Sequence, residues 1–382
     1  MRLNRLIGEI SGAFADLGTF LPLVVGVLAV RGFDPTGVLV GFGLFALATA
    51  AIYRRPVPVQ PMKAVAAVVI AAGLSPAAVA ASGLIMGLVL AVLAASGVIG
   101  RLERLIPQSV LLGIQLGIGA HLALVGFAHV AADPLTGGFA LALLVVLLLT
   151  PLRALACLLL LALVVAWQAA GGGLPSGLTL GFHLPGFAFP ASADFKAAAE
   201  TVVLPQLALT LTNAVLATAA IAAGLFPDDR DRITPPRLAL TSGVLNLLLA
   251  PIGALPMCHG VGGLVVQHRF GARTGVAPTI FGLICLGLGV FLGPGAVTLL
   301  TALPIAALGA LLVIGGADLA FSRRLFEARV DCLPAILATA VACVAVNVAV
   351  GLVAGLAVEV TRGAIARAFG RAAGKASKSR FS

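Results

Sequence analysis

Long apolar runs follow one another along the chain of 382 residues, separated by short clusters of proline, glycine and charged residues. A helix needs about 20 apolar residues to cross a bilayer, and such clusters mark where helices end. The pattern predicts an all-α polytopic membrane protein with fourteen transmembrane segments. In the first half they span 8–30, 35–53, 61–73, 76–99, 106–127, 134–150 and 152–171, and in the second half 199–225, 236–253, 257–268, 274–292, 295–318, 331–348 and 350–369.

Two of these segments, the third and the tenth, are too short to cross a membrane as complete helices. The third follows Pro56-Val57-Pro58-Val59-Gln60-Pro61-Met62-Lys63, and the tenth follows Leu255-Pro256-Met257-Cys258-His259-Gly260. Proline keeps the backbone before each segment out of the helical conformation. Two half-helices whose amino ends meet inside the membrane combine unpaired N–H groups with positive dipole ends, which suits an anion. We expect the anion between Met62–Ala64 and Cys258–Gly260.

The two halves of the chain also resemble each other in sequence. Similar stretches begin at Pro61 and Pro256, at Gly83 and Gly282, and at Pro107 and Pro304, with separations of 195 to 199 residues. This predicts a two-fold repeat. Seven segments per half invert the second repeat relative to the first. We expect a first repeat over 1–171, a connecting loop over 172–198, a second repeat over 199–370 and a basic tail over 371–382.

The composition fits a protein that keeps most of its surface in lipid. The chain is 60% hydrophobic and 10% charged, whereas a soluble domain carries about 25% charged residues. With a cytoplasmic amino terminus, all of the 24 Lys and Arg residues except Arg31, Lys63 and Lys196 lie on the cytoplasmic side. This predicts a multi-pass protein of a bacterial-type cytoplasmic membrane, with both termini cytoplasmic and the first helix retained. The net charge of +10 is therefore a topology signal and indicates no nucleic-acid partner.

Ionisable side chains inside a membrane cost about 2.5–3.5 kcal/mol each on insertion scales, so each needs a partner or a purpose. Lys63 lies in the first turn of a half-helix, where a cation is unfavourable unless an anion is present. Alternatively, Lys63 forms a permanent ion pair with Asp16. Asp16 is either a proton-coupling carboxylate or a hydrogen-bond acceptor in helix packing.

The eighth segment offers a polar face opposite the half-helices. Gln206, Thr210 and Asn213 have the spacing of one helical face, and Thr212 adds a hydroxyl. They are candidate oxyanion donors or, alternatively, hydrogen bonds between helices. His259 is a candidate donor and proton carrier, or a structural histidine.

Other polar positions point to ordinary structural roles. We interpret His121 and Asp318, at matching repeat positions, as residues of an interface or a loop end. The charged run 228–232 is predicted to be a solvated cytoplasmic loop. The five cysteines have no metal-binding spacing, and the chain has no nucleotide-binding loop and no catalytic grouping. We expect no metal, no cofactor and no enzyme activity.

Four stretches resemble the signature sequences of the MOT-type molybdate transporters, a family related to the sulfate permease superfamily. They are GAFADLGTFLPL (12–23), PVPVQPMKAVAAV (56–68), LPQLALTLTNAVLAT (204–218) and PMCHGVGGLVVQHRFGARTG (256–275). The resemblance extends from about residue 8 to 330. It implies a seven-plus-seven inverted repeat with core and gate domains, an oxyanion bound between segments three and ten, and a homodimer. It also implies that no STAS-type regulatory domain follows the last helix.

Together, residues and resemblance lead to the hypothesis of a proton-coupled secondary transporter that imports molybdate by alternating access. The expected substrate-binding residues are Gln60, Met62, Lys63, Ala64, Gln206, Thr212, Asn213, Cys258, His259 and Gly260, with Asp16 or His259 as proton carrier. Tungstate and sulfate are alternative ligands, because charge and shape alone do not separate these dianions. The alternative functions are a sulfate or other anion transporter of the same fold, a nucleobase-type permease, and a membrane-embedded enzyme or receptor.

Overall fold

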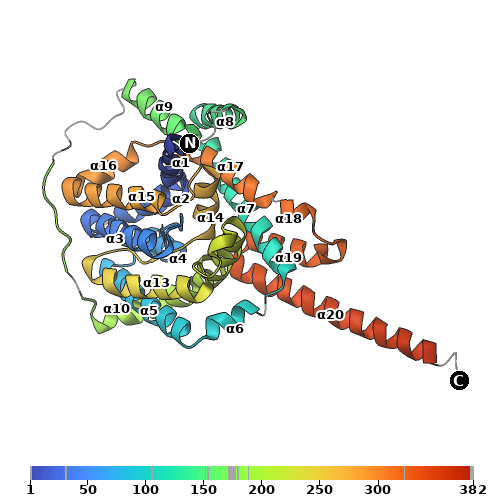
Figure 1. Cartoon of the computed structure of the whole chain (residues 1–382). Helices are drawn as coiled ribbons and strands as arrows, with labels where there is room; N and C mark the ends of the chain where they lie inside the picture. Colours follow the sequence, from blue (N-terminus) through green and yellow to red (C-terminus); the bar gives the residue numbers. More distant parts are fainter. Residues whose placement is uncertain are drawn as a thin grey trace.

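The computed structural model describes residues 2–30, 32–104, 106–150, 152, 155–170, 178, 180–187, 189–321 and 323–378. Parts of the predicted loop 172–198, the end of the basic tail, Arg31 and Arg153 lie outside these ranges. The described chain is almost entirely helical (Figure 1).

The first half contains α1 (Arg2–Phe14), α2 (Leu17–Leu28), α3 (Pro35–Tyr53), β1 (Gln60–Pro61), α4 (Lys63–Ala72), α5 (Pro76–Ala95), α6 (Val98–Arg104), α7 (Gln108–Ala132), α8 (Pro134–Leu149) and α9 (Ala156–Ala170). Proline at the first helical position starts α3, α5 and α8, and the side chain of Asp34, Ser75 or Asp133 caps each of them.

The second half begins with one long helical stretch made of α10 (Ser192–Ala198), η2 (Ala199–Val203), α11 (Leu204–Leu209), η3 (Thr210–Ala217) and α12 (Thr218–Leu225). It continues with η4 (Pro227–Asp229), α13 (Pro235–Leu249), η5 (Ala250–Ile252), β2 (Met257–Cys258), α14 (Val261–Arg269), α15 (Val276–Gly287) and η6 (Leu288–Leu292). The last elements are α16 (Gly295–Thr301), α17 (Ile305–Ala320), α18 (Arg323–Phe326), η7 (Val330–Cys332), α19 (Leu333–Ala345) and α20 (Val348–Lys378).

Helix lies within every one of the fourteen predicted segments. Five stretches of the described chain are by themselves long and apolar enough to cross a membrane: 5–28, 35–53, 76–95, 108–132 and 192–225. A sixth is formed if α16 and α17, which meet at 65°, act as one span. Shorter apolar helices occupy 134–149, 156–170, 276–292 and 330–345.

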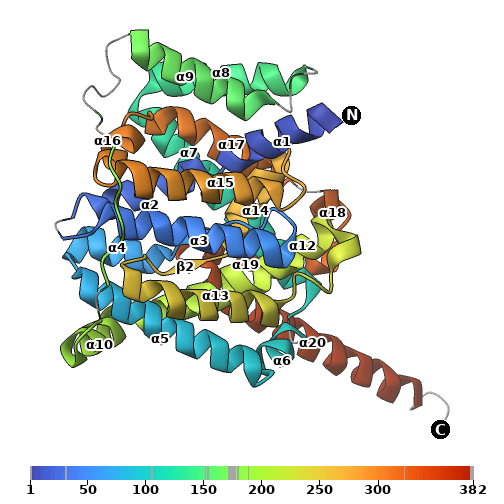
Figure 2. The same ribbon diagram turned by 60° about the vertical axis from the view of Figure 1, so that its left-hand side comes forward.

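The helices divide into two groups by their packing. In the first group, α1–α6 and α10–α15, helix α5 packs on α13 and α3 packs on α15; these four run side by side in Figure 2. In the second group, α7–α9 and α16–α20, helix α7 packs on α17 and α19, and α19 packs on α20. The groups meet where α17 contacts α2 and α14, and where α7 contacts η3.

Glycines face each other in three of these helix pairs. A Cβ added to either member of Gly43/Gly282, Gly87/Gly243 or Gly119/Gly316 would meet the carbonyl oxygen of the other member. Each pair therefore lets two helix backbones approach closely, a common packing mode for helices in membranes.

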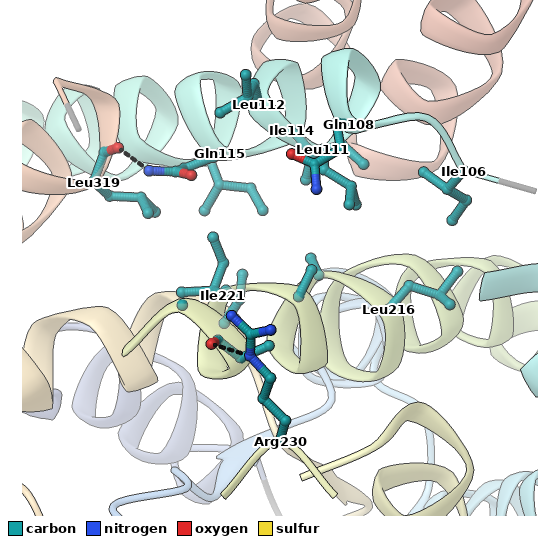
Figure 3. A pocket seen from close by; sticks show the side chains of 16 residues that line it. Ile106, Gln108, Leu111, Leu112, Ile114, Gln115, Leu216, Ile221, Arg230 and Leu319 are labelled. Atoms are coloured by element: carbon teal, nitrogen blue, oxygen red, sulfur yellow. Dashed lines mark hydrogen bonds between the residues drawn. The ribbon is translucent and has the colours of Figure 1, made fainter. Parts of the chain in front are cut away.

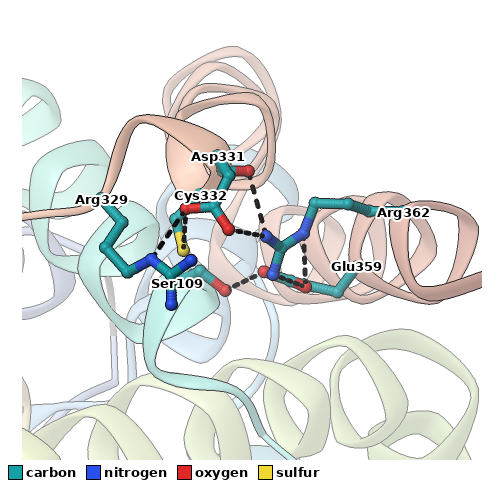
Figure 4. Close-up of polar contacts among 6 residues, drawn as sticks. All are labelled: Ser109, Arg329, Asp331, Cys332, Glu359 and Arg362. Atoms are coloured by element: carbon teal, nitrogen blue, oxygen red, sulfur yellow. Dashed lines mark hydrogen bonds and ion pairs between the residues drawn. The ribbon is translucent and has the colours of Figure 1, made fainter. Parts of the chain in front are cut away.

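A cluster of polar and charged side chains joins the start of α7, η7 and the middle of α20 (Figure 4). Glu359 on α20 accepts a hydrogen bond from Ser109 on α7 and pairs with Arg362 at 2.7 Å. Arg362 also pairs with Asp331 of η7 at 2.9 Å. The cluster explains why Glu359 is tolerated in an apolar stretch.

Candidate substrate site

The two short helices begin beside a common two-stranded ribbon. β1 and β2 pair antiparallel, with Gln60 opposite Cys258 and Pro61 opposite Met257. Directly after β1 the Met62 N–H donates to the Pro256 carbonyl oxygen at 2.8 Å, and α4 begins at the next residue. α14 begins three residues after β2, at Val261. The ribbon thus brings the amino ends of α4 and α14 to one place, as the proline-led segments predict.

Asn246 of α13 holds β2 in position. Its amide accepts a hydrogen bond from the Met257 N–H at 2.8 Å and donates to the Met257 carbonyl oxygen at 2.7 Å. Sequence reasoning missed this residue, although an asparagine within an apolar helical stretch was the signal that could have found it.

His259 is completely buried, and its ring is occupied by protein partners. Nδ1 lies 3.0 Å from the Pro58 carbonyl oxygen, and Nε2 lies 3.1 Å from Oγ1 of Thr241. Because a carbonyl only accepts, Nδ1 is the donor there, and Nε2 is occupied by the Thr241 hydroxyl. The Tyr53 hydroxyl reaches the same threonine at 2.6 Å. This geometry leaves no free ring donor for an anion, so His259 positions the ribbon.

Asp16, at the break between α1 and α2, forms a buried cluster with Thr19 and Gln60. Its carboxylate accepts hydrogen bonds from the Thr19 hydroxyl and from Nε2 of Gln60, the latter at 2.6 Å. Oε1 of Gln60 is buried without a hydrogen-bond partner among the described residues. A Cβ at Gly260 would collide with that oxygen, and a Cβ at Gly263 would collide with the Asp16 carboxylate. The glycines therefore bring the start of α14 against this cluster.

Lys63, the first residue of α4, is half-buried. The described ion pairs include none between Lys63 and Asp16, so the alternative of a permanent Lys63–Asp16 pair does not hold here. The Lys63 ammonium is nevertheless near enough to act electrostatically on Asp16, Cys258 and His121. Within the part of the chain that the structure describes, Lys63 forms no ion pair, so its charge is available to an anion at this site.

Gln206 connects the eighth predicted segment to α4. Its Oε1 accepts a hydrogen bond from the Ala64 N–H at 2.8 Å, and its Nε2 donates to the Thr210 hydroxyl at 2.9 Å. Further along η3, Oδ1 of Asn213 is buried without a partner among the described residues. The Thr212 hydroxyl instead donates to the Ala208 carbonyl oxygen of its own helix at 2.8 Å. η3 has the wide turns of a π-helix, which often occur at functional sites.

The amide groups of the two helix starts are partly occupied. The Met62 and Ala64 N–H groups have the partners already named. In an antiparallel ribbon, bonded and non-bonded residue pairs alternate, so the Met62–Pro256 bond places Cys258 in a bonded pair with Gln60. The other first-turn amides, of Lys63 and Val65 in α4 and of residues 261–263 in α14, have no partner among the described hydrogen bonds. These are the orphan donors of a helix start.

A cavity of about 350 Å³ touches the start of α14, and Figure 3 shows side chains that line it. Its walls are α7 on one side and the end of η3 with α12 on the other, so it lies between the two helix groups. Val261, the first residue of α14, is one of its lining residues. The walls are mostly apolar, with Gln108, Gln115 and Arg230 as the polar side chains among the described lining residues.

The fold is that of a class of membrane anion transporters. The transmembrane domain of a cyanobacterium bicarbonate transporter, BicA, matches with a TM-score of 0.56 and 17% identity, covering 92% of this chain and 97% of that chain. The murine Slc26a9 anion transporter in the inward-facing state matches with a TM-score of 0.59 and 12% identity, covering 93% of this chain and 68% of that one.

The sequence then defines the family. A family model described as "Molybdate transporter of MFS superfamily" matches residues 8–122 and 198–319, more than half of the chain. Molybdate transporter 1 of Chlamydomonas reinhardtii is 32% identical, covering 82% of this chain and 83% of the relative. Molybdate transporter 1 of Arabidopsis thaliana is 30% identical, covering 88% and 84%. The chain belongs to the molybdate transporter family; it is a membrane transporter and not an enzyme. The resemblance seen in the sequence is confirmed.

Proposed function

We propose that this protein is a secondary transporter that imports molybdate, bound between the amino ends of α4 and α14. The observation that carries the proposal is the convergence of two helix starts beside Lys63, where several first-turn amides and the Lys63 ammonium have no partner among the described residues. Helix amino ends bind oxyanions through such N–H groups and through the helix dipole. The relatives named as molybdate transporters favour molybdate as the ligand.

The proposed ligand set is narrower than the one predicted from the sequence. The oxyanion accepts hydrogen bonds from the free first-turn amides of α4 and α14, and Lys63 supplies charge. Gln206 and Asn213 face it from the eighth segment, and Gln60 borders it. Met62, Ala64 and Cys258 shape the site through the backbone, whereas Gly260 and His259 fix the ribbon. The sequences of η3 and α14 contain no carboxylate, which fits an anionic substrate better than a nucleobase.

The proposed architecture remains the seven-plus-seven inverted repeat with fourteen crossings and the boundaries predicted above. Three features support it: the family match has one stretch in each half, the facing Gly119 and Gly316 occupy equivalent repeat positions, and α4 and α14 are equivalent half-helices. We assign the first helix group to the core domain and the second to the gate domain. Movement of one against the other opens the site to each side in turn.

Asp16 is the proposed proton carrier, in preference to His259. Its carboxylate lies in the cluster that contacts the start of α14, so protonation would alter hydrogen bonds next to the bound anion. His259 has both ring nitrogens in protein contacts. Proton coupling, the homodimer, the cytoplasmic termini and the binding of tungstate stay predictions.

The test is uptake of labelled molybdate by the purified protein in sealed liposomes, with and without excess sulfate. We expect accumulation that a tenfold excess of sulfate leaves largely intact. Equal competition by sulfate would replace molybdate by a general oxyanion as substrate, and no accumulation of either would contradict transport. Lys63→Ala is expected to abolish uptake while the protein remains monodisperse, since a single half-buried charge facing a dianion contributes several kcal/mol.

A further inference from the structure

Arg230 is the one charged side chain among the described residues that line the cavity at the start of α14. It follows η4, within the run 228–232 that the sequence predicts to be a solvated loop. Figure 3 shows its guanidinium pointing from the α12 side into the space that faces α7. Its side chain is exposed, as in most of the loop, but it also lines the cavity.

Two of the neighbouring charges of the loop, Asp229 and Arg232, are already paired. Asp229 binds Arg55 and, at 3.0 Å, Arg232. Arg230 forms no ion pair in the described part of the chain, and its Nε donates to the Ala223 carbonyl oxygen at 3.2 Å. Ala223 lies in the last turn of α12, where a cation is favourable. This contact uses one of the five guanidinium N–H groups and leaves the others available to a ligand.

The cavity has the size and the walls to make that charge effective. Its volume of about 350 Å³ is roughly ten times the volume that a water occupies, so a tetrahedral dianion fits with some of its hydration. Apolar walls of low dielectric focus the field of a single charge. A guanidinium fork binds two oxygens of an oxyanion at once.

We propose that Arg230 is a binding residue that captures the oxyanion in this cavity, between the substrate site and the mouth of the cavity. The inference rests on the proposed function and adds a second contact on the route of the anion. Its chemistry selects tetrahedral dianions over uncharged solutes. By raising the local concentration of the anion, Arg230 speeds exchange between the substrate site and the solution on its own side of the membrane.

The experiment compares Arg230→Gln, Arg230→Lys and the control Arg232→Gln in sealed liposomes of known protein orientation, with labelled molybdate exchange as the readout. Arg232 is the matched control because it lies in the same loop but is paired with Asp229 and does not line the cavity. We expect Arg230→Gln to raise KM about tenfold for molybdate supplied on the cavity side, within the range for electrostatic focusing. KM on the opposite side stays within twofold, and the dependence of the cavity-side KM on ionic strength weakens. Arg230→Lys recovers part of the loss, because it restores charge without the fork.

The experiment distinguishes failure of the Arg230 capture role from failure of the proposed function. If the wild-type protein exchanges molybdate and Arg230→Gln behaves like Arg232→Gln on both sides, the capture role is refuted while the proposed function stands. The same holds if Arg230→Gln raises KM equally on both sides. If the wild-type protein exchanges no molybdate, the proposed function fails, and the inference fails with it.

Discussion

A carboxylate in place of the Gln206 amide should act as a built-in competitor of the substrate. Oε1 of Gln206 already accepts the Ala64 N–H at 2.8 Å, and glutamate has nearly the same shape. The negative charge would lie at the amino end of α4, where helix dipole and Lys63 both favour it. We therefore expect Gln206→Glu to fold well and to lose molybdate binding.

The size of the expected loss in molybdate affinity follows from the position of the neighbouring amides. An oxyanion on the first turn of α4 places its centre roughly 6 Å from the new carboxylate. One charge against two at that distance gives about 5 kcal/mol of repulsion at an effective dielectric constant of about 20. Since about 1.4 kcal/mol corresponds to tenfold, affinity should fall by more than about 10³-fold. Gln206→Met removes the hydrogen bond without adding charge, and its affinity should change by less than about tenfold.

The assay is isothermal titration of molybdate into the three purified proteins at pH 8.5, where the new carboxyl is ionised. Thermal unfolding in detergent checks that Gln206→Glu is at least as stable as Gln206→Met. Wild-type affinity in a folded Gln206→Glu protein would refute the placement of the anion at the start of α4. Equal losses in both variants would show that the hydrogen bond, and not the charge, matters.

Three further predictions concern the surroundings of the site. Gly263→Ala should destabilise the protein by about 2 kcal/mol, because its methyl group collides with the Asp16 carboxylate; a thermal unfolding scan checks this against Gly287→Ala, whose methyl group meets no neighbour within 4 Å. Asp16→Asn should abolish uptake driven by a proton gradient but preserve exchange of labelled molybdate, and loss of both would assign Asp16 to structure alone. Asp318 of α17 pairs with Arg269 of α14 at 2.5 Å, between the two helix groups. Since both side chains are partly exposed, Asp318→Asn should change turnover by at most about fivefold, with little effect on molybdate affinity. Unchanged turnover would mean that this ion pair is the same in both conformations of the transport cycle.

Much of the fold follows from local sequence. Proline and glycine punctuate the apolar runs, so helix lies within each predicted segment, and the proline-led stretches before Lys63 and Val261 give the two short helices. The small residues that face each other in α7 and α17 are also visible as glycines in matching stretches of the two halves. These features depend on neighbours in the chain or on a repeated pattern.

The details of the site depend on contacts between distant residues and could not be predicted in the same way. Gln206 caps α4 across 142 positions of sequence, and this contact occupies an amide that was predicted to bind the anion. The ring of His259 turns toward Pro58 and Thr241, which no local pattern indicates. Arg230 was hidden in a charged run, because the sequence does not show which cation of that run faces the cavity.

The most direct test of the central claim is a crystal structure with molybdate, with the molybdenum located by its anomalous scattering. The claim predicts one strong peak between the first turns of α4 and α14, within hydrogen-bond reach of the Lys63 and Val261 amides through the molybdate oxygens. A fully occupied peak elsewhere in the protein, with these two helix starts empty, would contradict it.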